Sequence, residues 1–140
     1  MTQKEKNEEL QQLLEAASKG DAQAQYELGN LYNEYEDYEE ALKWWGLAAA
    51  QGHPHALYFI GLCYKEGRGV KQSDFEAVQK WLLAGLYDDA DALYNLGWMY
   101  YYGKGTECNM LRARVWFFFA AMLGHIEAKE TFAKLMAMQQ

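Results

Sequence analysis

The residues of this chain that could do chemistry are few, and they form no recognisable set. Two of the three histidines, His53 and His55, lie on either side of Pro54, the only proline. A protein zinc site takes three or four ligands, and this short run has no cysteine or paired carboxylate beside it. We therefore expect no metal here. Pro54 is better interpreted as the first residue of a helix, where its missing amide hydrogen costs nothing.

Nucleophilic catalysis needs a serine, cysteine or similar group beside a base that a third group orients. The only serines are Ser18 and Ser73, and neither recurs at a spacing that brings a histidine and a carboxylate to it. Cys63 and Cys108 occupy unrelated positions, and we expect them to be reduced thiols. The sequence thus predicts no catalytic residue, no metal and no cofactor, and we expect that the protein is not an enzyme.

The elements that would position any side chain are internal repeats. One series of residue types returns after 36 residues, and part of it is found 32 residues earlier. A period in this range is typical of stacked helical pairs. The second unit contains Ala56, Ile60, Gly61, Tyr64, Gly67, Gly69, Ala77, Trp81 and Ala84; the third contains Ala92, Leu96, Gly97, Tyr100, Gly103, Gly105, Ala113, Phe117 and Ala120; the first contains Ala24, Leu28, Gly29 and Tyr32.

Each repeat is expected to be two antiparallel helices. Apolar spacing predicts first helices over 22–34, 54–66 and 90–102, and second helices over 38–51, 74–87 and 110–123. Glycine in mid-helix costs about 1 kcal/mol relative to alanine, so Gly29, Gly61 and Gly97 need a compensation. We expect it to be close approach of the second helix at its small residues, Ala41, Ala48 and their equivalents.

The chain is therefore expected to be all-α, an α-solenoid of about eight helices that forms one domain over residues 1–140. Both ends match half a repeat. The predicted division is an N-terminal capping helix over 5–20, a repeat with a short loop over 21–52, repeats over 53–88 and 89–124, and a C-terminal capping helix over 125–140.

These units resemble Sel1-like repeats, which are relatives of tetratricopeptide repeats with a longer loop between the two helices. The first unit lacks the glycine-containing loop and is closer to the tetratricopeptide pattern. The residues that carry the resemblance in the third unit are the run from Ala92 to Tyr100, Gly103-Lys104-Gly105, Ala113, Trp116, Ala120-Ala121 and Gly124. The resemblance implies a right-handed superhelix whose first helices line a concave face, and an adaptor function through that face.

On that geometry, a set of polar and aromatic residues from the three first helices would bind another protein or a peptide. Aromatic side chains suit such contacts because they offer large area at a low entropy cost. The same residues could instead serve only to cover the inner surface. The predicted partner-binding residues are Tyr26, Asn30 and Asn33 in the first repeat, His55, Tyr58, Leu62 and Lys65 in the second, and Asp91, Tyr94, Trp98 and Tyr101 in the third.

The charge is negative and uneven. The net charge is −7, of which residues 1–70 carry −6 (twelve acids against six bases). This balance argues against binding of nucleic acid, which needs a basic surface, and favours a basic partner for the acidic stretch 34–40. The longest apolar run, Val115–Gly124, is about half the length that crosses a bilayer. With no visible secretory signal, we expect a cytoplasmic protein that does not bind membranes, as a monomer or weak homodimer.

Three functions remain open at this point. The first is a bacterial adaptor or scaffold that binds a protein or peptide. The second is an immunity or inhibitor protein that neutralises a toxin or effector, because a compact acidic chain suits a basic enzyme. The third, more remote, is a cell-wall-related enzyme, implied by secreted Sel1-like proteins. Those proteins are rich in paired cysteines, and this chain has two cysteines.

Overall fold

The computed structural model describes residues 2–138, and in this part of the chain it contains eight α-helices and no strand. The helices are α1 (Gln3–Ser18), α2 (Ala22–Glu34), α3 (Tyr38–Ala50), α4 (Pro54–Glu66), α5 (Asp74–Leu86), α6 (Ala90–Tyr102), α7 (Met110–Met122) and α8 (Ile126–Ala137). The three first helices, α2, α4 and α6, have the predicted bounds. The three second helices, α3, α5 and α7, end one residue earlier than predicted.

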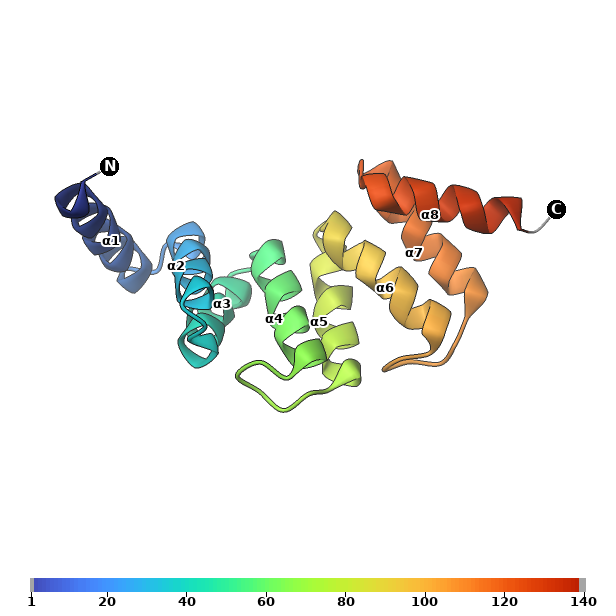
Figure 1. The fold of residues 1–140 in the computed structure, drawn as a ribbon, viewed down its shortest axis with the longest axis horizontal. Coiled ribbons are helices and arrows are strands. Elements are labelled where there is room, and N and C mark those ends of the chain that lie inside the picture. The colour runs from blue at the N-terminus through green and yellow to red at the C-terminus, as the bar shows by residue number, and fades with distance from the viewer. Residues whose placement is uncertain (1, 139–140) are drawn as a thin grey trace.

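Each helix packs on its neighbours in sequence, so the array grows in one direction. The most extensive contacts join the two helices of a repeat, α2 with α3, α4 with α5 and α6 with α7. The result is an open arc whose two ends rise on the same side (Figure 1). The turns between repeats lie on that inner side, and the long loops of the second and third repeats lie on the outer side (Figure 1). The all-α solenoid is thus confirmed.

One turn recurs wherever a second helix gives way to the next first helix. It begins with a residue at positive φ, a conformation that glycine adopts readily and aspartate tolerates. The residue after it caps the new helix, because its side chain accepts a hydrogen bond from the backbone N–H three residues on. The positive-φ residues are Gly20, Gly52, Asp88 and Gly124. The caps are Asp21, His53, Asp89 and His125, and Pro54 is the first residue of α4, as predicted.

The core is organised around one large aromatic residue in each second helix. Trp45, Trp81 and Phe117 are at most 1% exposed. Each lies directly on the mid-helix glycine of its own repeat, and a Cβ at Gly29, Gly61 or Gly97 would overlap the ring. The sequence analysis assigned this close approach to alanines. In the structure the alanines are buried too, but the glycines make room for the aromatic ring.

Among the helices of residues 2–138, none combines the length and apolar character that crossing a bilayer requires. The apolar run Val115–Gly124 falls mostly within α7, which ends at Met122.

Candidate partner-binding face

All eleven predicted partner-binding residues lie on the first helices, and we call the surface that they share the first-helix face. Ten of them are half-buried, and Lys65 is exposed. On α2 they are Tyr26, Asn30 and Asn33; on α4 they are His55, Tyr58, Leu62 and Lys65; and on α6 they are Asp91, Tyr94, Trp98 and Tyr101. The face therefore runs across three repeats, and its residues differ in how far the fold already uses them.

The third repeat holds a group of aromatic side chains, the aromatic cluster, made of Tyr94, Trp98, Tyr101 and Tyr102. The ring of Trp98 stacks on Tyr102 with centroids 5.7 Å apart and meets Tyr101 edge-on at 5.3 Å. On its buried side, the ring of Trp98 meets the ring of Phe117 edge-on, with centroids 5.0 Å apart. This packing against the core fixes the orientation of Trp98. Tyr102 is 61% exposed, and it is not among the eleven predicted residues.

A hollow of about 310 Å³ opens beside this cluster. The structure here brings Lys65 from α4 to Trp98 on α6, as a shared face requires. The hollow is lined by Lys65, Trp81, Asn95, Trp98, Met99, Tyr102 and Lys104. Neither lysine forms an ion pair within the described residues. Two ammonium groups and an amide beside aromatic rings suit a polar or acidic group of a bound chain.

The first two repeats use more of their predicted residues for internal contacts. Tyr26 stacks on His53 with centroids 4.4 Å apart, and Tyr58 stacks on His55 at 5.2 Å. Burial, with a contribution from the charge of Asp91, raises the pKa of Tyr58 above 10.0. Asn30 accepts a hydrogen bond of 3.1 Å from Nε1 of the buried Trp45, and Leu62 packs against the main core. These contacts hold the array together.

Three polar pairs join successive repeats on the inner side of the arc, and we call them the inter-repeat pairs. In each pair, the capping residue of α4, α6 or α8 contacts the side chain at the second position of the first helix in the preceding repeat. His53 Nδ1 accepts from the N–H of Ala56, so Nε2 donates to Gln23 Oε1 at 2.9 Å. His125 makes the same contacts with Ala128 and with Asp91, at 3.2 Å.

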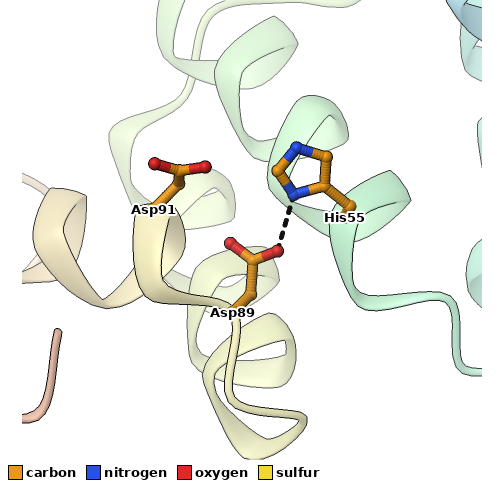
Figure 2. Close-up of side chains that lie close together, drawn as sticks. All are labelled: His55, Asp89 and Asp91. Carbon is orange, nitrogen blue, oxygen red and sulfur yellow. Dashed lines mark hydrogen bonds and ion pairs between the residues drawn. The ribbon is translucent and has the colours of Figure 1, made fainter. Parts of the chain in front are cut away.

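In the middle pair the histidine and its polar partner exchange positions: the capping residue is Asp89, and the histidine, His55, is the second residue of α4. His55 Nδ1 donates to Asp89 Oδ2 at 2.7 Å, while Asp89 Oδ1 accepts from the N–H of Ala92 at 3.0 Å. Figure 2 shows this contact, with Asp91 beside it. The sequence analysis missed Asp89, although its position directly after the turn residue Asp88 was a usable signal.

The two neighbouring histidines respond to these surroundings in opposite directions. The hydrogen bond to Asp89 raises the pKa of His55 above 6.5, with the charges of Asp89 and Asp91 acting in the same sense against partial burial. Burial lowers the pKa of His53 below 6.5, and the nearby His55 adds to this effect.

His55, Asp89 and Asp91 also offer one nitrogen and two oxygens that all lie within 4.8 Å of one another (Figure 2). A divalent cation could use such a set. Each group, however, already has a protein partner: Asp89 has His55 and the N–H of Ala92, and Asp91 has His125. We therefore interpret the group as part of the contacts between repeats.

The fold and its repeated turn define an α-solenoid of paired helices. The Sel1 repeat family model matches residues 22–53, 54–83 and 90–125. This chain belongs to the Sel1 repeat family, whose solenoids generally serve as protein–protein interaction modules.

Solved structures of similar proteins agree with this assignment. A Sel1 repeat protein from Oxalobacter formigenes is 30% identical with a TM-score of 0.82, over 90% of this chain and 98% of the other. A protective antigen present in uropathogenic Escherichia coli strains is 31% identical with a TM-score of 0.81, over 85% of this chain and 26% of the other. Helicobacter pylori cysteine rich protein B, at 23% identity and a TM-score of 0.75 over 94% and 97%, shows the shared fold alone.

A curated relative is the rat protein called DAP3-binding cell death enhancer 1. It is 34% identical over 80 residues, which are 56% of this chain and 16% of the relative. The chain thus spans about a sixth of the length of that protein.

Proposed function

We propose that this protein is an adaptor that binds a segment of another protein along the first-helix face, centred on the aromatic cluster and the hollow beside it. The observation that carries the proposal is the orientation of Trp98, half-exposed at the surface and packed on Phe117 from below. A large aromatic side chain that is already ordered loses little entropy when a partner covers it.

The local and the overall charge favour a partner segment that carries both signs of charge. The hollow supplies Lys65, Asn95 and Lys104 for an acidic or polar group. The whole chain has a net charge of −7, which favours a partner that is basic overall. The name of the rat relative describes it as DAP3-binding, which fits a binding role for Sel1 repeats. We extend the proposal to a bacterial, cytoplasmic setting, without a catalytic role.

The test is affinity capture from a lysate of the source organism with the parent protein and with a Tyr94→Ala/Trp98→Ala/Tyr101→Ala variant. We expect a partner that the parent retains and the variant loses. The matched control is Phe75→Ala/Leu83→Ala/Leu86→Ala on α5, which removes three exposed apolar side chains, 58%, 45% and 78% exposed, from a second helix.

Circular dichroism must first show that both variants remain helical. Loss of the partner in the α6 variant, with retention in the α5 variant, places binding on the first-helix face. Equal binding by the parent and the α6 variant contradicts the proposal.

A second candidate is an inhibitor or immunity protein that covers a basic toxin or effector. The turn between α2 and α3 favours it, because Glu34, Glu36 and Asp37 are exposed there around Tyr35, which is 76% exposed. This candidate predicts one folded partner with nanomolar affinity, weakened by Glu34→Lys/Glu36→Lys. The adaptor predicts micromolar binding of short segments that this double variant leaves unchanged.

A further inference from the structure

The two ends of the array are complementary halves of one repeat. At the C-terminal end, α8 has the position of a first helix, because its turn and cap, Gly124 and His125, match Gly52 and His53. Within residues 2–138 no second helix follows α8 to complete its repeat; its extensive contacts are with α7, the second helix of the repeat before it. Phe132 and Met136 are consequently half-exposed and 42% exposed, whereas their equivalents Leu96 and Tyr100 are 0% and 7% exposed.

At the N-terminal end the situation is reversed, because α1 has the position of a second helix. The turn after it, at Gly20, matches the turn at Gly52 that follows α3. Counting back 32 residues, Leu13 takes the place of Trp45, the aromatic residue that fills the core of a complete repeat. Leu13 is half-buried, while Trp45 is 1% exposed, since no first helix precedes α1 in the described chain.

Two hollows mark where the missing helices would lie. One, of about 340 Å³, lies between α7 and α8 and is lined by Leu111, Arg114, Val115, Phe118, Phe132 and Met136. This is where a second helix would pack on α8. The other, of about 1100 Å³, lies between α1 and α2, and its lining includes Leu10, Leu13, Ala16 and Leu31. This is where a first helix would pack on α1.

We propose that two copies of this 140-residue chain associate head to tail, with α1 of one copy completing the repeat that begins with α8 of the other. Helix α1 would enter the hollow between α7 and α8, while α8 would enter the hollow between α1 and α2. The contact continues the packing already seen within each repeat, where a first helix meets a second helix along its length.

The sizes of the facing residues fit each other. In a complete repeat a mid-helix glycine lies against a large ring, as Gly97 lies against Phe117. In α8 the equivalent of Gly97 is Ala133, which is exposed. A Cβ at this position leaves no room for a tryptophan or phenylalanine, but the residue that α1 would bring is the smaller Leu13.

The charges fit as well. The hollow beside α1 is lined by Glu9, Asp21, Glu27 and Glu34 against a single lysine, Lys6, whereas the hollow beside α8 has Arg114 as its only charged residue. Glu9 and Arg114 lie at adjacent positions along their second helices, because Glu9 is equivalent to Ala41 and Ala113 and Arg114 directly follows Ala113. Arg114 also replaces Val78, which is 1% exposed. Arg114 is half-buried in the single chain and becomes buried when the second copy covers it. A buried arginine needs an acidic partner, and Glu9 of the second copy supplies it.

The interface is heterologous: it joins two different surfaces, one at each end of the array, so each copy in a dimer keeps one unpaired end. Larger assemblies should therefore form as the protein concentration rises. Sedimentation velocity of the parent over a range of concentrations should show a rising weight-average mass. Glu9→Arg and Arg114→Glu should each weaken association at least about tenfold, because like charges then face each other. The double variant Glu9→Arg/Arg114→Glu should restore it, as should an equimolar mixture of the two single variants.

Several results would overturn the proposal. They are a parent that stays monomeric at every concentration, association that survives Glu9→Arg, or a double variant that remains monomeric while its melting temperature equals that of the parent. Glu39→Arg, the same change at an exposed acid of α3, is the control and should leave association unchanged. Ala133→Trp, a substitution at an exposed position, should block the contact without unfolding the chain, which separates interface loss from misfolding.

Discussion

The imidazole of His55 donates a hydrogen bond of 2.7 Å to the carboxylate of Asp89, which at the same time caps the helix of the next repeat. Because one carboxylate serves both helices, the contact fixes the position of α6 relative to α4. The chain makes two further contacts of this kind, at His53 and His125, so the curvature of the array is set by polar pairs as well as by the apolar core.

The His55–Asp89 contact predicts a pH dependence of stability. The pKa of His55 is raised above 6.5 in the folded protein, so the folded state binds this proton more tightly than the unfolded state. The stabilisation is therefore complete below pH 6.5 and is lost as the pH rises through the raised pKa. NMR titration should show that Asp89→Asn, which keeps a capping side chain, lowers the pKa of His55.

His53 should act in the opposite direction. Its pKa is lowered below 6.5, and its neutral ring is needed to accept from the N–H of Ala56. Its contribution is present above pH 6.5 and is lost as the pH falls through the lowered pKa. Urea unfolding between pH 5 and 8 should therefore separate His55→Gln from His53→Asn. If both substitutions lowered the free energy of unfolding by the same amount at every pH, this account would be wrong.

The packing of glycine against an aromatic ring predicts a large effect of side-chain size at Gly97. Gly97→Leu should reduce the free energy of unfolding by about 3 kcal/mol, at the upper end of the usual cost of overpacking, because the new side chain overlaps Phe117. Gly46→Ala is the control. Gly46 lies in mid-helix with nothing within 4 Å of a new Cβ, so this change should stabilise by about 0.5–1 kcal/mol. Chemical denaturation measures both, and equal effects would refute the packing argument.

The turn at Asp88 predicts a stabilising substitution. Asp88 has φ 61° where the three equivalent turns have glycine. Asp88→Gly should raise the free energy of unfolding by up to about 1 kcal/mol, the net of relieved backbone strain and the greater entropy of unfolded glycine. Gly124→Ala, at φ 93° with nothing within 4 Å of the new Cβ, should destabilise by about 1–2 kcal/mol through the backbone alone. Thermal melts of the two variants should move in opposite directions.

The two free cysteines should differ in reactivity. Cys63 is 3% exposed, and burial raises the pKa of its thiol to about 11, so it has almost no thiolate at neutral pH. Cys108 is exposed in the loop before α7. A thiol reagent should label Cys108 in the native protein and Cys63 only after unfolding, as mass spectrometry of digested samples can show. Rapid labelling of Cys63 in the folded chain would contradict its burial.

The repeat and, to within one residue, the bounds of its six helices were determined by the sequence itself, whereas the capping helix predicted over 5–20 lies at Gln3–Ser18. Capping residues, glycine stops and apolar spacing act within a few residues of one another, so the period of 36 and the three large residues Trp45, Trp81 and Phe117 could be recognised without coordinates. The predicted binding residues were placed on the first helices by the resemblance to Sel1-like repeats, which implies that these helices line the concave face.

The contacts between elements were decided only by the tertiary structure. His55 and Asp89 are 34 residues apart, and their meeting depends on how one repeat is rotated against the next. The neighbours of Gly29, Gly61 and Gly97 depend on which way the aromatic rings turn. The hollow between Lys65 and Lys104 depends on both factors. Spacing along a single helix contains none of this information, since rotation between helices is set by the sum of many packed side chains.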